Sequence, residues 1–136
     1  MTADPREALI ATVQAAYEAF ARGDVDTALT FVSPDAELRP EGTSNATGRP
    51  VYRGHQGIRD YFEDVSRVWD GTLELEPVDY RAVAGSVVVF GRVRARPRGE
   101  PFETEAVWVW KLRDGLLTSG QVFSTRRAAI AAAQAG

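Results

Sequence analysis

The spacing of apolar residues changes at Asp70 and Gly71, and this change restricts the possible folds more than any other feature of the sequence. Upstream, apolar residues recur every three or four positions and predict helices over residues 5–22, 25–32 and 56–69. Downstream, apolar and polar residues alternate and predict strands over residues 72–83, 86–96, 102–113 and 116–124. This order indicates an α+β fold, in which a strongly bent antiparallel sheet packs on three N-terminal helices.

The remaining segments complete one domain. Short strands are predicted at residues 36–39 and 51–52, with a loop rich in Gly, Pro and Ser between them, and an alanine-rich helix closes the chain after Ser124. No repeat or linker interrupts the 136 residues, a usual length for one folding unit. We therefore expect a single domain over residues 1–136.

The residue types present exclude several kinds of chemistry. The chain has no cysteine and one histidine, His55, so disulfides, thiolate metal sites, a cysteine nucleophile and multi-histidine zinc or iron sites are excluded. The sequence also lacks a glycine-rich phosphate loop and a serine nucleophile elbow. We expect neither a cofactor nor a metal.

Charge and hydropathy argue against large partners. A net charge of -3 gives no general attraction to nucleic acid. The first residues lack the basic start and apolar run of a secretion signal, and no segment approaches the roughly 18 apolar residues of a membrane span. We expect a cytoplasmic protein that binds neither nucleic acid nor membrane.

Four stretches carry a family resemblance. They are "YEAFARGDVDTALTFVSPDAEL" (residues 17–38), "YRGHQGIRDYF" (52–62), "VVVFGRVRARPRG" (87–99) and "VWKLRDGLL" (109–117). In this order they resemble the SnoaL-like proteins of the nuclear transport factor 2-like superfamily, which includes the ketosteroid isomerases. The resemblance implies a cone-shaped barrel with one apolar pocket and a homodimer formed through the outer face of the sheet.

The same resemblance leaves the activity open, because the family includes isomerases, polyketide cyclases, dehydratases, epoxide hydrolases and proteins without known chemistry. The positions of the isomerase tyrosine, base and protonated acid fall on Ala16, Pro40 and Trp108. The acid/base of the cyclase "HWD" motif falls on Val122. These groups are missing, so any chemistry must come from other residues that line the cone.

Aromatic residues are the best candidates for a binding site. Alternation places Trp108 and Trp110 on one strand face, which the resemblance implies is the pocket face. Together with Tyr17 they predict a lining suited to a flat apolar ligand, completed by Phe20, Tyr61, Phe62 and Trp69. The alternative is that these rings only fill the core of a short chain.

Three residues are candidates for catalysis. Glu41 lies one residue beyond the family's base position, and a carboxylate buried there would act as a general base or acid. Arg39 would pair with Glu41 or hold an anionic oxygen, and Tyr17 would donate to a ligand carbonyl. The alternatives are an exposed loop charge for Glu41 and a buried core tyrosine for Tyr17.

Two further features have structural explanations as well as functional ones. His55 precedes the third predicted helix, where the helix dipole disfavours an imidazolium, so we expect a ring hydrogen-bonded to the neighbouring loop rather than a proton-transfer group. Arg92, Arg94 and Arg96 share a strand face. They would bind phosphate, pair with a carboxylate across the sheet or dimer interface, or form a solvated surface.

Two hypotheses follow for the function. The first is a cofactor-independent isomerase, cyclase or lyase that acts on a hydrophobic polyketide-like or terpenoid-like molecule, with Glu41 as base and Tyr17 or Arg39 stabilising negative charge. The second is a non-catalytic module that uses the same pocket for ligand binding, or serves for dimerisation. The absence of the family's catalytic groups favours the second hypothesis.

Overall fold

Helices and strands follow each other as the sequence predicts. The computed structural model describes residues 5–40, 49–123 and 125–135. Its helices are α1 (Pro5–Ala21), α2 (Val25–Leu29), α4 (Gly54–Val68) and α5 (Arg126–Gln134). Its strands are β1 (Val32–Arg39), β2 (Tyr52–Arg53), β3 (Glu74–Val83), β4 (Ser86–Ala95), β5 (Phe102–Arg113) and β6 (Leu116–Phe123), and a 3-10 turn, η1 (Pro97–Gly99), precedes β5.

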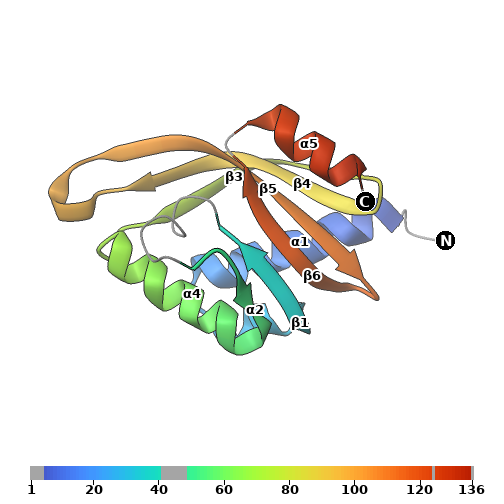
Figure 1. The fold of residues 1–136 in the computed structure, drawn as a ribbon, viewed down its shortest axis with the longest axis horizontal. Coiled ribbons are helices and arrows are strands. Elements are labelled where there is room, and N and C mark those ends of the chain that lie inside the picture. The colour runs from blue at the N-terminus through green and yellow to red at the C-terminus, as the bar shows by residue number, and fades with distance from the viewer. Residues whose placement is uncertain (1–4, 41–48, 124, 136) are drawn as a thin grey trace.

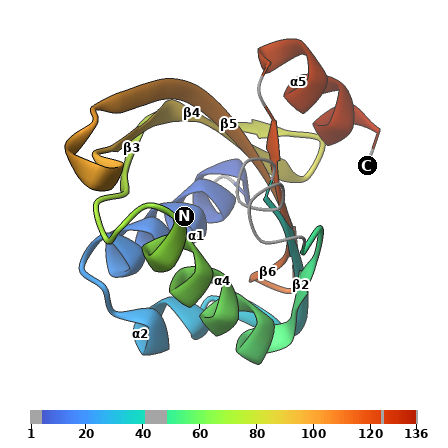
Figure 2. The same cartoon turned by 60° about the vertical axis from the view of Figure 1, so that its left-hand side comes forward.

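The strands form one sheet in the order β2-β1-β6-β5-β4-β3. All neighbours are antiparallel except β1 and β6, which run parallel. Helices α1, α2 and α4 lie on the concave side of the curved sheet, and α5 lies on the other side (Figures 1 and 2). The expected α+β fold is therefore confirmed.

The first strand begins earlier than predicted, and the second helix ends earlier. Asp24 caps α2, since its carboxylate accepts hydrogen bonds from the backbone nitrogen and hydroxyl of Thr27. The helix stops at Leu29, and Val32, predicted to be helical, begins β1. Pro34 is tolerated in this strand because the pairing with β6 is irregular between Val32 and Glu37, where a missing N–H disturbs no regular ladder.

Alternate residues of β4 and β5 belong to two separate cores. The inner core, under the helices, contains Val87, Val89 and Trp108. The outer core, under α5, contains Val88, Phe90, Val107, Val109, Ala129 and Ala133. The period of two in the sequence thus decides which residues reach the concave side.

The arginine row lies on the outer face. Arg92 donates to Glu103 at 2.6 Å, and Arg94 contacts Glu76 at 3.0 Å and Glu103 at 3.6 Å. These pairs join β3, β4 and β5, so two members of the row have carboxylate partners across the sheet. All four side chains remain about half exposed, which is typical of surface pairs that contribute little to stability.

Within the described ranges, no helix is both long enough and apolar enough to cross a membrane.

Candidate functional site

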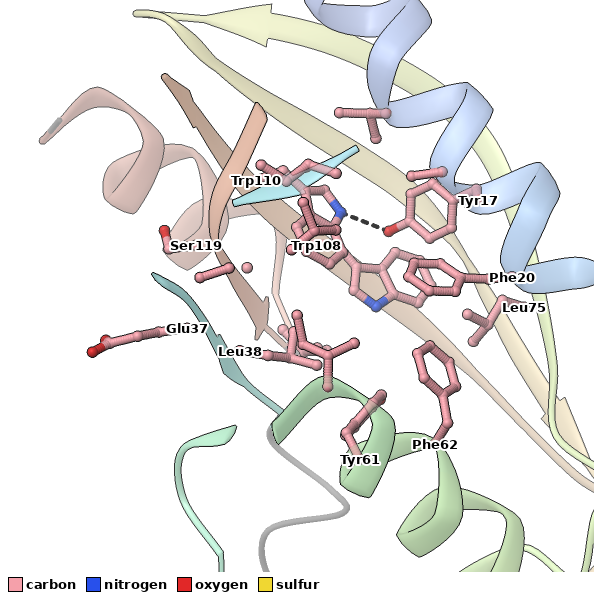
Figure 3. A pocket seen from close by; sticks show the side chains of 18 residues that line it. Tyr17, Phe20, Glu37, Leu38, Tyr61, Phe62, Leu75, Trp108, Trp110 and Ser119 are labelled. Carbon is pink, nitrogen blue, oxygen red and sulfur yellow. Dashed lines mark hydrogen bonds between the residues drawn. The ribbon is translucent and has the colours of Figure 1, made fainter. Parts of the chain in front are cut away.

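A small cavity lies between the helices and the concave face of the sheet. Its lining comes from α1, α4 and strands β1, β3, β5 and β6, and includes five of the predicted aromatic residues together with Tyr17: Phe20, Tyr61, Phe62, Trp108 and Trp110 (Figure 3). The cavity volume is about 50 Å³. A water molecule needs about 10–15 Å³ of such space, so the cavity admits a few waters or one small group such as a carbonyl.

Tyr17 and Trp110 form the polar centre of the cavity wall. The indole nitrogen of Trp110 donates to the Tyr17 hydroxyl at 2.8 Å (Figure 3), and the two rings meet edge to face with centroids 6.0 Å apart. Tyr17 is only 6% exposed. Burial raises the pKa of Tyr17 well above its ordinary value, although the bond from Trp110 acts in the opposite direction. The hydroxyl therefore keeps its proton at neutral pH.

The Tyr17 proton is available to a ligand. The hydroxyl accepts from Trp110, and among the described residues it donates to none. A hydroxyl that already accepts a hydrogen bond is polarised and becomes a better donor. Tyr17 is thus a neutral donor at the edge of an apolar space.

Glycines on neighbouring strands make room for the two tryptophan rings. A Cβ atom on Gly120, which pairs with Trp110 across the sheet, would lie 2.6 Å from Cε3 of that ring and closer still to Cζ3. A Cβ atom on Gly91 would lie 3.1 Å from Cζ3 of Trp108. No sequence motif predicts a role for Gly120, whereas the structure shows that its small size leaves room for the Trp110 ring.

Glu37 lines the cavity, and its carboxylate is bonded to two arginine side chains. It accepts from Arg53 Nε at 3.2 Å and from Arg39 Nη2 at 3.0 Å. These two bonds hold the pKa of Glu37 below its ordinary value, and the bond from Arg53 has the larger effect. Its side chain points away from the aromatic rings (Figure 3). Glu37 is therefore an ionised rim residue.

The predicted site residues do not all come together. Trp69 does not line the cavity: it follows the last turn of α4 and stacks on Phe102, with ring centroids 5.1 Å apart. Arg39 is half exposed and bonds to Glu37, not toward the cavity. Glu41 lies outside the described residues.

A wider groove adjoins the cavity between α1, α4 and the edge strand β3. Its volume is about 820 Å³, within the usual range for small-molecule sites. The groove and the cavity share Tyr17, Phe20, Phe62 and Leu75. The Phe20 and Phe62 rings, with centroids 4.6 Å apart, belong to both. The four shared side chains form the boundary between the cavity and the groove.

His55 has a structural contact outside the cavity. Its Nε2 lies 2.8 Å from the carbonyl oxygen of Val32, which can only accept, so Nε2 carries the proton. The bond ties the first turn of α4 to the start of β1. The ring is hydrogen-bonded as expected, but its partner is a residue of β1 and not of the neighbouring loop.

Across residues 5–40, 49–123 and 125–135, no three histidine, aspartate or glutamate side chains gather closely enough to hold a metal ion.

The curved sheet, the helices on its concave side and the apolar cavity define a nuclear transport factor 2-like (NTF2-like) protein. Residues 13–120 match the model of the SnoaL-like domain. The austinoid biosynthesis cluster protein H of Aspergillus calidoustus is 31% identical over 117 residues, which are 80% of this chain and 76% of that protein. The chain belongs to the SnoaL-like family.

Solved structures agree with this assignment. TerC co-crystallised with polyporic acid is 27% identical, with a TM-score of 0.78, over 89% of this chain and 94% of that chain. An NTF2-like protein of unknown function from Burkholderia pseudomallei K96243 is 21% identical, with a TM-score of 0.76, over 91% of this chain and 95% of that chain. The second likeness shows the fold alone.

Proposed function

We propose that the chain binds a hydrophobic, polyketide-like or terpenoid-like molecule in the aromatic cavity and acts on it as a cofactor-independent isomerase, cyclase or lyase. The observation that carries the proposal is the neutral Tyr17 hydroxyl, polarised by Trp110 at 2.8 Å in an apolar space. A relative named for a biosynthesis cluster and a similar structure bound to a small molecule support it.

The dimensions of the site favour a ligand that enters by one end. A cavity of about 50 Å³ holds only a carbonyl-bearing end, while the groove of about 820 Å³ holds the rest. Water is largely excluded from such a space, so a hydrogen bond to a developing negative charge is stronger there than in solution.

The proposed reaction is enolisation followed by return of the proton or by ring closure. Glu41 removes a proton from the carbon beside the carbonyl, and the electrons of that C–H bond form the C=C bond of an enolate. The carbonyl oxygen takes the negative charge and accepts a hydrogen bond from Tyr17. In a substrate whose C=C bond is conjugated with the enolate, Glu41 returns the proton to the far carbon of that bond and the double bond moves, which completes an isomerisation. Alternatively, the enolate carbon attacks a second carbonyl, whose oxygen takes the proton from Glu41, which completes a cyclisation. Arg39, the other charge-stabilising group predicted from the sequence, has no part in this step, because its side chain bonds to Glu37 and does not line the cavity.

The alternative is a non-catalytic binding module, and the position of Glu37 favours it. This carboxylate is held by two arginines at the rim and points away from the rings. If Glu41 contributes no base, the cavity binds ligands without changing them.

Proton exchange separates the two functions without the natural substrate. We expect the protein to accelerate the replacement of hydrogen by deuterium beside the carbonyl of 1-tetralone, a bicyclic aromatic ketone, as followed by mass spectrometry. Glu41→Gln and Tyr17→Phe should each slow the exchange by about 100-fold, because each removes one group of the enolisation step. Glu7→Gln, an exposed glutamate on α1, is the matched control.

Binding of 1-tetralone, measured by tryptophan fluorescence, decides how a negative result is understood. Binding without exchange above the buffer rate would establish the binding module and overturn the enzymatic proposal. Absence of both binding and exchange would overturn both functions for ligands of this class.

A further inference from the structure

One face of α1 forms a wall of the groove beside the cavity. Gln14, Tyr17, Glu18 and Ala21 all line the groove, and they follow each other at the three- and four-residue intervals of a single helix face. Glu18 therefore lies on the side of α1 that borders the groove. It is the one charged residue among these four.

The charge of Glu18 acts on the part of the groove that β3 forms. Tyr80, on β3, also lines the groove, and its ring meets Tyr17 edge to face, with centroids 6.2 Å apart. Burial raises the pKa of Tyr80, and the negative charge of Glu18 raises it further. The carboxylate is thus close enough to Tyr80 to influence a charge within the groove.

No positive side chain balances Glu18 in the groove. The charged residues that line it in the described part of the chain are Glu18 and Glu74, and the Glu18 carboxylate has no ion-pair or hydrogen-bond partner within the described residues. Arg22, which follows on α1, does not line the groove, and Arg94, which pairs with Glu74 across the sheet, bonds to two other glutamates. The groove therefore has a negative charge that a cationic ligand can neutralise.

The remaining walls of the groove suit an organic cation. Tyr17, Phe20, Phe62 and Tyr80 line the groove, and the faces of aromatic rings attract ammonium groups through the ring quadrupole. A carboxylate in the same place would meet the charge of Glu18 and no positive partner among the described lining residues. A ligand end with a protonated amine is therefore favoured over an acidic end.

We propose that the groove selects hydrophobic ligands whose outer end carries a protonated amine, and that Glu18 is the residue that determines this specificity. The inference rests on the proposed function, in which the carbonyl-bearing end occupies the cavity, and it adds the chemical class of the end that occupies the groove. The ammonium group pairs with the Glu18 carboxylate and contacts the neighbouring rings. A ligand with an acidic end is rejected, because specificity includes repulsion as well as attraction.

Three para-substituted acetophenones test the inference, because they differ mainly in the charge of one end. At neutral pH para-(aminomethyl)acetophenone is a cation, para-(hydroxymethyl)acetophenone is neutral and para-acetylbenzoate is an anion. Equilibrium dialysis should show that the amine binds about three- to tenfold more tightly than the alcohol, and the carboxylate more weakly by a similar factor. In about 1 M salt, which shortens the screening length to about 3 Å, these differences should shrink.

Variants of Glu18 connect the preference to one side chain. Glu18→Gln keeps the size of the side chain and removes its charge, so the affinities for the amine and the alcohol should come within about twofold of each other, with the alcohol unaffected. Glu18→Lys should reverse the order, so that the carboxylate binds best. Glu7→Gln removes the same charge from the same helix outside the groove. It is the matched control and should leave all three affinities unchanged.

The outcomes separate this inference from the proposed function. If the alcohol binds and the amine binds no better, amine selection is overturned while the pocket function stands. An equal change in Glu7→Gln and Glu18→Gln would overturn the role of Glu18, because net charge alone would then account for the preference. Absence of binding for all three probes would remove the pocket function and the amine selection together.

Discussion

The two faces of the sheet use alternate residues of the same strands, and the inner face lines the aromatic cavity. On the outer face, Val88 and Val109 pack against Ala129 and Ala133 of α5, and small side chains fill the interface. On the inner face, Trp108 and Trp110 pack against the helices, and a space of about 50 Å³ remains.

Polarity differs between the faces as well. The inner face has the Trp110–Tyr17 hydrogen bond beside its cavity, whereas the outer core consists of valine, phenylalanine and alanine. One alternating sequence pattern therefore gives a closely packed outer core and an inner binding site. The side chains at each position, aromatic or small, decide which of the two a face forms.

The largest expected effect comes from a charge placed in the outer core under α5. Ala129 is 0% exposed, so Ala129→Asp places an unpaired carboxylate in the outer core. We expect a loss of about 3 kcal/mol in the free energy of unfolding, because an isolated buried charge is not tolerated and α5 must detach. Urea denaturation measures it. Gln134→Asp, at the exposed end of α5, is the control, and equal stability of the two variants would contradict the buried interface.

The same variant bears on the predicted dimer. The resemblance places a dimer contact on the outer face, and α5 covers part of that face. If α5 shields the sheet from a second copy, its detachment in Ala129→Asp should increase association, seen by light scattering as a rise in mass with concentration. If α5 is part of the dimer contact, association should fall.

The next effect concerns the seat of Trp110. In Gly120→Ala the new methyl group would overlap the Trp110 ring, which the hydrogen bond to Tyr17 holds in place. We expect a destabilisation of about 2 kcal/mol, the usual cost of overpacking. In an NMR spectrum of protein labelled with nitrogen-15 at the indoles, the N–H resonance of Trp110 should also move upfield as its hydrogen bond is lost. An unchanged signal would show that the ring does not depend on the glycine.

Much of the fold follows from local patterns in the sequence. The turns at Ala84–Gly85 and Asp114–Gly115 have positive φ at both residues, as tight hairpins require, and β5 has the predicted bounds, Phe102–Arg113. The predicted boundary between α2 and β1 was wrong. Parallel pairing with the distant strand β6 extends β1 back through the Ser-Pro-Asp segment. A tertiary contact of this kind leaves no local signal.

The site is less predictable for the same reason. Alternation places Trp108 and Trp110 on the cavity face, and helical spacing adds Phe20 and Phe62. No spacing rule, however, joins Trp110 to Tyr17, which lie 93 residues apart, or turns Trp69 toward Phe102. Residue types and faces can be predicted from sequence, but donor and acceptor pairs depend on how distant elements meet.

Two valines sharpen the comparison between the faces. Val13 lines the cavity and Val88 belongs to the outer core, and they are 1% and 0% exposed. Valine to alanine removes two methylene equivalents at either site, so each variant should lose about 1.5–2 kcal/mol. Only Val13→Ala should increase the affinity for an apolar probe such as α-methylstyrene, because only it enlarges the cavity. A similar gain in Val88→Ala would mean that the outer core also admits ligands.

The smallest effect appears at alkaline pH. Burial raises the folded-state pKa of Tyr17 above the unfolded value of about 10. Between these values the unfolded chain has lost the proton that the folded chain retains, so stability is intact below pH 10 and falls as the pH rises further. Tyr17 contributes at most about 1.4 kcal/mol per pH unit to this fall in the free energy of unfolding.

Tyr17→Phe isolates that contribution from the loss of the hydrogen bond. Below pH 10 the variant should be less stable by about 1 kcal/mol, since Trp110 loses its acceptor. Above pH 10 this difference should shrink, because the stability of the variant falls less steeply. Urea denaturation from about pH 9 to about pH 11 measures the slope. Tyr80→Phe is the comparison, because burial also raises the pKa of Tyr80, which is less deeply buried. This variant should change the slope of the free energy of unfolding against pH by less than Tyr17→Phe does. Parallel curves for Tyr17→Phe and the unmodified chain would show that the Tyr17 hydroxyl ionises as freely as an exposed one.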